Sequence, residues 1–265
     1  MKKSVKFLIK KYTKKLLIRF FSHEEVSEII KTHYPPLQVI QGHLTFNKDG
    51  LATRHSSSFL NDKHFIESYK LGKATGSWGG VDIEWRAYIA CWCASKASAL
   101  EGDFVECGVN KGGLARTIIH YVDFQKLKKK FYLLDTFNGL VDEYISDEEK
   151  KMGILPGGYE ECYEEVKRTF AGFNVKIIKG AVPETLSEVD TAHIAYLSID
   201  MNCVAPEIAA AEFFWNKMIS GAAMLLDDYG WSGHENQKEA FDDFCRQKGV
   251  NILALPTGQG IIFKP

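Results

Sequence analysis

Residues 251–265, NILALPTGQGIIFKP, decide which architecture the chain can adopt. Two short apolar runs flank the turn Pro256-Thr257-Gly258-Gln259-Gly260. Parallel strands need a crossover of about a dozen residues or more, and this connection is far too short for one. The stretch therefore predicts an antiparallel hairpin at the end of the chain.

Before the hairpin, short and nearly all-apolar strands alternate with helices. A core-facing helix is predicted over residues 81–100, where apolar residues recur at helical spacing. Strands are predicted within 103–109, 130–137, 174–180, 193–200 and 222–230, and helices within 114–122, 159–170, 206–218 and 236–249. Apolar strands separated by helices indicate a parallel sheet that is covered on both faces.

The parallel sheet and the final hairpin together separate two similar architectures. A dinucleotide-binding domain needs no reversed last strand, and its Gly-x-Gly-x-x-Gly turn is missing here, which disfavours an NAD-dependent oxidoreductase. The class I methyltransferase fold does end with a reversed strand. We therefore expect a doubly wound α/β fold of this Rossmann-like type, with a mostly parallel seven-stranded sheet, a terminal antiparallel hairpin and an N-terminal helical or irregular cap.

Length and composition favour one soluble catalytic domain. A single core of this type grows to roughly 250–300 residues, and the chain has 265. Lysine and arginine number 33 against 34 acids, so a partner with a phosphate backbone, such as a nucleic acid, is disfavoured. The six cysteines form no Cys-x-x-Cys pair, which predicts free thiols and a cytoplasmic location.

The N-terminal part is expected to differ from the catalytic domain. Residues 1–21 carry eight basic side chains and no acid, which indicates a basic amphipathic helix. This helix could lie on the inner, anionic face of a membrane, or dock on the domain or on a second subunit of a homo-oligomer. Residues 33–80 are rich in turn-forming residues and are interpreted as an irregular segment. The predicted domains are an acceptor cap with the basic helix (1–80) and a cofactor-binding domain (81–265).

Ligands of open α/β sheets bind at the carboxyl ends of the strands, so the residues that follow the strands are the candidate cofactor contacts. Glycines in the first turn let the backbone approach a ligand, and Glu106 can accept a hydrogen bond from an ammonium group. Asp135 suits ribose hydroxyls or a turn cap, and both roles are compatible. The predicted cofactor contacts are Glu106, Cys107, Gly108, Gly112, Gly113, Asp135, Thr136, Phe137, Gly180, Ala181, Val182 and Asp200.

Four stretches, in this order and spacing, resemble the macrocin O-methyltransferase family, whose members act on sugar hydroxyls. They are VECGVNKGG (105–113), LLDTFNGL (133–140), LSIDMN (197–202) and LLDDYG (225–230). The resemblance covers residues 81–265. It implies S-adenosylmethionine as cofactor and a Mg²⁺ site whose ligands would be Asp200, Asp227 and Asp228.

The chain also departs from the family pattern. The family glycine turn usually continues with Ser, whereas this chain has Leu114. After the fourth strand the family tends to have Asp-x-Asp-x-Tyr, and only its first acid, Asp200, is present. The resemblance does not extend before residue 81, so it implies no particular acceptor.

The residues themselves allow a metal-assisted methyl transfer. Oxygen ligands suit Mg²⁺, although the three aspartates could instead cap the helices that follow them. A carboxylate such as Asp200 could take the proton of an acceptor hydroxyl, and His55 and His234 are alternative bases. Two alternative functions are methylation of a catechol-like small molecule and nucleotide binding without catalysis.

Overall fold

The structure, a computed structural model, describes residues 22, 24–25, 28, 40 and 42–265. Two compact units are present. The smaller unit comprises the described residues up to Phe46, together with Ala52–Ser56. The larger unit comprises Asn47–Leu51 and Ser57–Pro265. Strands β1 (Phe46–Lys48) and β2 (Leu51–Thr53) form a two-stranded sheet.

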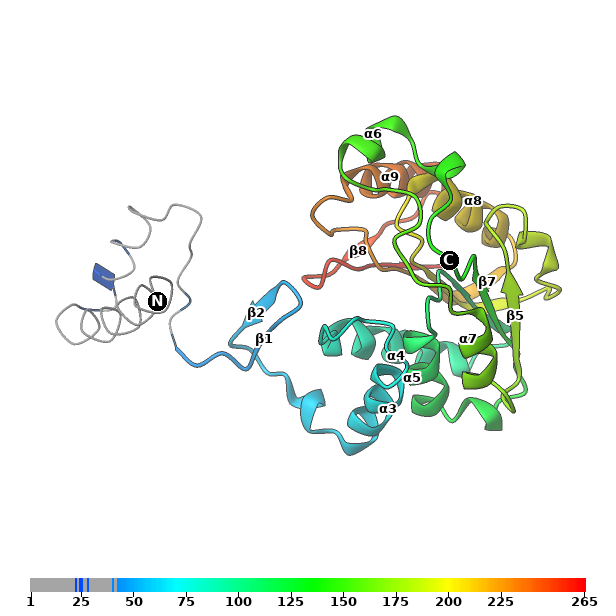
Figure 1. Cartoon of the computed structure of the whole chain (residues 1–265). Helices are drawn as coiled ribbons and strands as arrows, with labels where there is room; N and C mark the ends of the chain where they lie inside the picture. Colours follow the sequence, from blue (N-terminus) through cyan, green and yellow to red (C-terminus); the bar gives the residue numbers. More distant parts are fainter. Residues whose placement is uncertain (1–21, 23, 26–27, 29–39, 41) are drawn as a thin grey trace, which may run out of the picture. The chain divides into compact units, whose positions relative to one another are not determined.

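A seven-stranded sheet crosses the larger unit (Figure 1), with the strand order β5-β4-β3-β6-β7-β9-β8. Five strands are mutually parallel, and β9 runs antiparallel to both β7 and β8. The strands are β3 (Asp103–Cys107), β4 (Phe131–Asp135), β5 (Val175–Lys179), β6 (Ile194–Ile199), β7 (Met218–Leu226), β8 (Leu253–Ala254) and β9 (Gly260–Phe263). The predicted fold class and terminal hairpin are therefore confirmed.

Helices cover both faces of this sheet, as its apolar strands require: every residue of β6 is buried. Helices α3 (Lys63–Lys73), α4 (Glu84–Ser98), α5 (Gly113–Tyr121) and α7 (Tyr163–Thr169) pack into one core. Helices α8 (Val204–Trp215) and α9 (Glu235–Lys248) pack into the other, beyond the sheet (Figure 1). Shorter elements are α6 (Asp147–Lys151), η1 (Ser58–Asn61), η2 (Phe124–Lys126), η3 (Asp142–Tyr144) and η4 (Leu186–Glu188).

Helix α3 corrects the expectation that residues 33–80 are irregular throughout. Asp62 caps the helix by accepting hydrogen bonds from the backbone N–H groups of His64 and Phe65. Its buried face includes Ser68 and Gly72, which an apolar pattern does not count. By its contacts, the stretch 57–80 belongs to the larger unit. The predicted division into an acceptor cap (1–80) and a cofactor-binding domain (81–265) stays a prediction.

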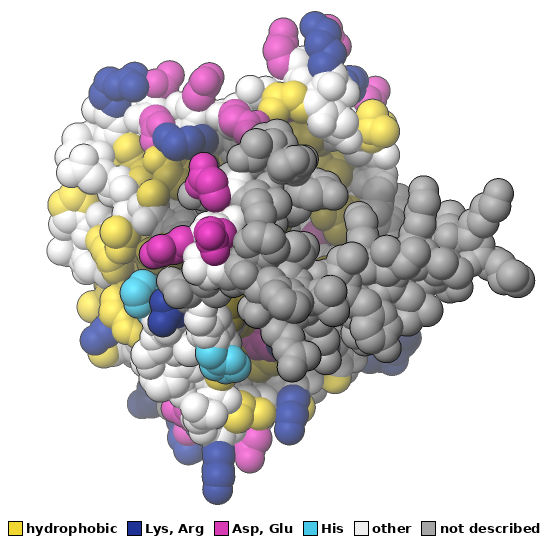
Figure 2. Space-filling view, turned by 90° about the vertical axis from the view of Figure 1, so that its left-hand side faces the viewer, with side chains coloured by type: hydrophobic (Ala, Val, Ile, Leu, Met, Phe, Trp, Pro, Cys, Tyr) yellow, Lys and Arg dark blue, Asp and Glu magenta, His cyan; other side chains and the backbone are white. Residues whose placement is uncertain are grey.

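The predicted basic helix, residues 1–21, lies outside the described residues. Within the described part of the chain, no helix is long and apolar enough to cross a membrane. Figure 2 shows acidic and basic side chains interspersed over the visible face, with several acidic side chains gathered near its middle.

Candidate active site

A cavity of about 410 Å³ opens at the carboxyl ends of the parallel strands, here called the strand-end cavity. Ten of the twelve predicted cofactor contacts line it: Glu106, Gly108, Gly113, Asp135, Thr136, Phe137, Gly180, Ala181, Val182 and Asp200. Cys107 and Gly112 do not. The Cys107 side chain is buried in the core, and the Phe170 ring lies where a side chain of Gly112 would begin.

The turn after β3 touches the end of β6 directly. The backbone N–H of Asp200 donates to the carbonyl oxygen of Cys107 over 2.8 Å. Gly108 has a φ of +87°, and a Cβ there would lie 1.6 Å from the carbonyl oxygen of Asp200. Only glycine fits, because both the backbone conformation and the space exclude a side chain.

Glu106 is a buried acid on the wall of the strand-end cavity. Its residue is 2% exposed, and Oε2 has no hydrogen-bond partner within the described structure. Burial raises the pKa of Glu106 well above its ordinary value, and the nearby charges of Asp135 and Asp227 raise it further. A buried carboxyl with a free oxygen fits a cationic group such as an ammonium.

Asp135 is occupied by the backbone of the surrounding turns. Its carboxylate accepts hydrogen bonds from the N–H groups of Val109 (2.6 Å), Asn110 (2.7 Å) and Phe137 (2.6 Å). The carboxylate therefore ties the turn after β3 to the turn after β4. A contact with ribose hydroxyls stays a prediction.

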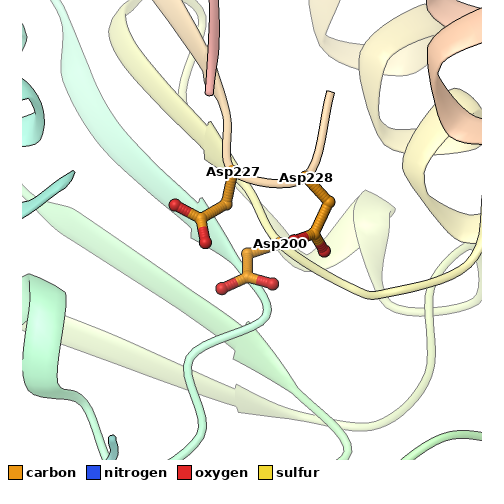
Figure 3. Close-up of side chains that lie close together, drawn as sticks. All are labelled: Asp200, Asp227 and Asp228. Carbon is orange, nitrogen blue, oxygen red and sulfur yellow. The ribbon is translucent and has the colours of Figure 1, made fainter. Parts of the chain in front are cut away.

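The three predicted metal ligands converge at the ends of the neighbouring strands β6 and β7 (Figure 3). Asp200, Asp227 and Asp228 each offer an oxygen, and these atoms lie within 4.8 Å of one another. Burial and the charge of Asp227 raise the pKa of Asp228 to about 7, and the pKa of Asp200 is also raised. Oδ2 of Asp228 has no hydrogen-bond partner in the described structure. Crowded carboxylates with a free oxygen fit a divalent cation.

Arg86 of α4 lines the strand-end cavity, and the sequence alone did not indicate it. Its guanidinium contacts Asp227 (Nη1 to Oδ2, 2.6 Å) and makes two bonds to Asp49, from Nε (2.7 Å) and Nη2 (3.0 Å). The Trp231 ring lies 5.1 Å from the guanidinium. Gln259 Nε2 donates to the other oxygen of Asp227 over 2.9 Å. In the sequence, Arg86 is one of three charged residues of α4, beside Glu84 and Lys96, so its charge alone did not single it out.

The two predicted histidine bases differ in position. His234 lies beside the acids, with Nδ1 3.8 Å from Oδ2 of Asp228 and 2.7 Å from Nε2 of Gln237. Burial lowers the pKa of His234, which favours the neutral ring. His55 belongs to the smaller unit, where it is exposed. A role for either as base stays a prediction.

Two buried glutamates, which the sequence did not single out, support the loop after β6. Glu207 Oε1 accepts from the backbone N–H of Met201 over 3.0 Å, and Glu149 Oε1 accepts from that of Val204 over 2.7 Å. Glu149 comes from α6, in the segment 140–160 that forms the outer wall of the strand-end cavity. The loop that carries Asp200 is thus held on two sides.

Tyr159 is an aromatic side chain of this outer wall that lies close to the acids. Burial, followed by the charge of Asp200, raises the pKa of Tyr159 to about 12. Its hydroxyl therefore stays neutral near pH 7 and can donate a hydrogen bond.

The fold resembles that of known methyltransferases. The family model of macrocin-O-methyltransferase (TylF) matches residues 88–254, more than half of the chain. No curated protein matches the chain significantly in sequence.

Among solved structures, the O-methyltransferase NovP is 22% identical with a TM-score of 0.57, over 68% of this chain and 79% of NovP. The calicheamicin methyltransferase CalS11 is 14% identical with a TM-score of 0.54, over 85% of this chain and 99% of CalS11. The methyltransferase PaMTH1 of Podospora anserina, solved with SAH bound, is 11% identical with a TM-score of 0.52, over 92% of this chain and 97% of PaMTH1. These likenesses show a shared fold.

Proposed function

Because the chain belongs to the macrocin O-methyltransferase family, whose members use S-adenosylmethionine, we propose that it methylates a sugar hydroxyl in a Mg²⁺-dependent reaction. The observation that carries this proposal is the cluster of Asp200, Asp227 and Asp228 on the wall of the strand-end cavity. It combines a candidate metal site and a candidate cofactor site in one cavity.

The cofactor would supply an electrophilic methyl group. Glu106 is proposed to hold its ammonium group, since Oε2 is buried and free. Asp135 is proposed to meet the ribose, and Gly180, Ala181 and Val182 to flank the adenine. The chemical demand on the protein is mainly to hold the two reacting atoms in line, since a methyl transfer needs no covalent intermediate.

The three aspartates would hold Mg²⁺, which lowers the pKa of a hydroxyl bound to it. Asp200 is proposed to take the hydroxyl proton, because its carboxylate lines the strand-end cavity and lies beside the proposed metal site. His234, beside Asp228, is the alternative acceptor of this proton. His55, which belongs to the smaller unit, is a further candidate for this role.

A polyhydroxylated acceptor suits a metal held in this way. If each aspartate supplied one oxygen, a bound Mg²⁺ would keep positions free for other oxygens, and the vicinal hydroxyls of a sugar could take two of them. A structure of CalS11 describes that protein as a TDP-rhamnose 3′-O-methyltransferase, which shows that the fold can serve a sugar acceptor.

The decisive test is methylation of a sugar-bearing acceptor by the parent and by Asp228→Asn, each with and without a chelator. We expect chelation and the substitution each to reduce turnover severely, while affinity for S-adenosylhomocysteine stays nearly unchanged. An amide caps a helix about as well as a carboxylate, so undiminished activity of Asp228→Asn in chelator would return the aspartates to a structural role.

We also propose that residues 1–21 bring the enzyme to anionic lipid at the inner face of the membrane. The support is the charge of eight basic residues without an acid. Sedimentation with anionic vesicles at low and high salt tests this, because salt screens such attraction. No sedimentation at low salt would leave docking within a homo-oligomer as the role of the segment.

A further inference from the structure

The segment 75–78, which the sequence did not connect with the cofactor, lies against the start of α5. Ser77 Oγ accepts a hydrogen bond from the backbone N–H of Gly113, the first residue of α5, over 2.8 Å. Asn110 Nδ2 donates to the carbonyl oxygen of Ser77 over 3.0 Å. Trp78 stacks on Tyr69 of α3, with ring centroids 5.1 Å apart. These contacts hold Ser77 at the wall of the strand-end cavity, which Ser77 itself lines.

Two polar features of this part of the cavity point to an amino-acid ligand. The N-terminus of a helix attracts a negative group, and here it belongs to α5, a helix of nine residues. Glu106 lines the same cavity, and the residue is only 2% exposed. Its Oε2 has no hydrogen-bond partner in the described structure, so it suits a positive group. An α-amino acid carries both charges on one carbon. Leu114, the second residue of α5, is apolar and supplies no hydroxyl there.

We propose that Ser77 binds the carboxylate of the methionine moiety of S-adenosylmethionine through its hydroxyl proton. This inference rests on the cofactor of the proposed function. The Ser77 oxygen accepts from Gly113, which leaves the hydroxyl proton for another partner.

The other neighbour of Ser77 explains why its proton is available. Thr75 Oγ1 lies 3.1 Å from Ser77 Oγ and donates its own proton to the carbonyl oxygen of Gly72 over 2.8 Å. Either hydroxyl of this pair could donate to the other, but the bond from Thr75 to Gly72 favours Ser77 as the donor in the free protein. A carboxylate is the stronger acceptor, so the proton turns to it when the cofactor enters.

The test compares two ligands by calorimetric titration of the full-length protein. S-adenosylhomocysteine contains the amino-acid moiety, and 5′-methylthioadenosine lacks it. For Ser77→Ala we expect about a tenfold or greater loss of affinity for S-adenosylhomocysteine, the range of a hydrogen bond to a charged group. Affinity for 5′-methylthioadenosine should change less than about twofold.

Ser77→Asp keeps an oxygen that can cap α5, since Asp caps as well as Ser, but places a negative charge beside the carboxylate. It should lose more affinity for S-adenosylhomocysteine than Ser77→Ala does, and none for 5′-methylthioadenosine. Thr75→Ala is the comparison variant: it removes the hydroxyl that competes for the Ser77 proton, so affinity for S-adenosylhomocysteine should not fall and affinity for 5′-methylthioadenosine should not change.

Equal losses for both ligands, or no loss for either, would overturn the role of Ser77 and leave only a helix cap. Failure of the parent itself to bind S-adenosylhomocysteine would instead refute the cofactor. The two failures are therefore distinguishable.

Discussion

Arg86 Nη1 lies 2.6 Å from Oδ2 of Asp227, so the acidic cluster already contains one fixed positive charge. Arg86 also pairs with Asp49. The side chain of Arg86 is 17% exposed, that of Asp227 10% and that of Asp49 7%. Removing only Arg86 from such a buried cluster is costly, because the two carboxylates stay desolvated and lose their partner.

We therefore expect Arg86→Met to lower the free energy of unfolding by about 3–5 kcal/mol in the presence of chelator. Added Mg²⁺ should restore part of this loss, since the ion would replace the missing charge. Arg86→Lys, which keeps a charge, should lose less. Urea unfolding with and without Mg²⁺ measures these differences, and a loss below about 1 kcal/mol for Arg86→Met, typical of exposed ion pairs, would contradict the argument.

Glu106→Gln should weaken binding of S-adenosylhomocysteine about tenfold or more at pH 8, because it removes a charged hydrogen-bond acceptor. Because the pKa of Glu106 is raised, the carboxylate form that an ammonium group needs becomes easier to reach as the pH rises. Affinity of the parent should therefore rise with pH, and that of Glu106→Gln should rise less. Titrations at several pH values decide this, and parallel pH profiles would count against Glu106 as the ammonium partner.

Glu207 should make the folded state less stable as the pH rises. Burial, followed by the charge of Asp228, raises the pKa of Glu207 well above 4.5 in the folded state. The folded protein thus keeps a proton that the unfolded chain releases, so the stabilisation is complete below about pH 4.5 and is lost toward the raised pKa. The slope is at most about 1.4 kcal/mol per pH unit.

The measurement is thermal unfolding of the parent and of Glu207→Gln between pH 5 and pH 8 in chelator. The Gln side chain can still accept from Met201, so only the titration is removed. The parent should lose more stability than the variant over this range. Curves that differ by a constant amount would show that Glu207 does not titrate in this way.

Glu149→Ala should open the outer wall of the strand-end cavity. The substitution removes the acceptor of the Val204 N–H group and half of the capping box with Ser146. Limited proteolysis should cut within residues 140–160 about tenfold faster, the effect of roughly 1.4 kcal/mol on a local opening equilibrium. Asp147→Ala, an exposed acid of the same helix, is the control, and equal cleavage rates for the two variants would disprove the role of Glu149.

The sheet and the acidic cluster were predictable because each follows from a local pattern. Every residue of β6 is buried, so its apolar run is nearly continuous in the sequence and is interrupted only by Ser198. Asp200 and Asp227 come at the ends of adjacent parallel strands, which meet at one edge of the sheet. Neighbourhood in the fold could therefore be inferred without knowledge of any single contact.

The remaining parts of the site depend on contacts between distant residues. Arg86 and Asp227 are 141 positions apart, and Ser77 and Gly113 are 36 apart. Helix α3 was missed because Gly72 and Ser68 form part of its buried face. The hydroxyl of Thr117 and the carbonyl of Gly113 lie where a Cβ of Gly72 would be. Such close approaches leave no periodic signal.

The contact of Gly108 with the carbonyl of Asp200 also limits how this enzyme can evolve. Any side chain at position 108 would displace the loop of Asp200, so a change selected for the cofactor would disturb the acids as well. The outer wall is freer: its Leu155 and Tyr159 are 61% and 45% exposed, so a change of side chain there disturbs little of the packed core. New acceptor specificities should therefore arise by mutation of the outer wall, while the turn at Gly108 remains invariant among descendants that keep the chemistry.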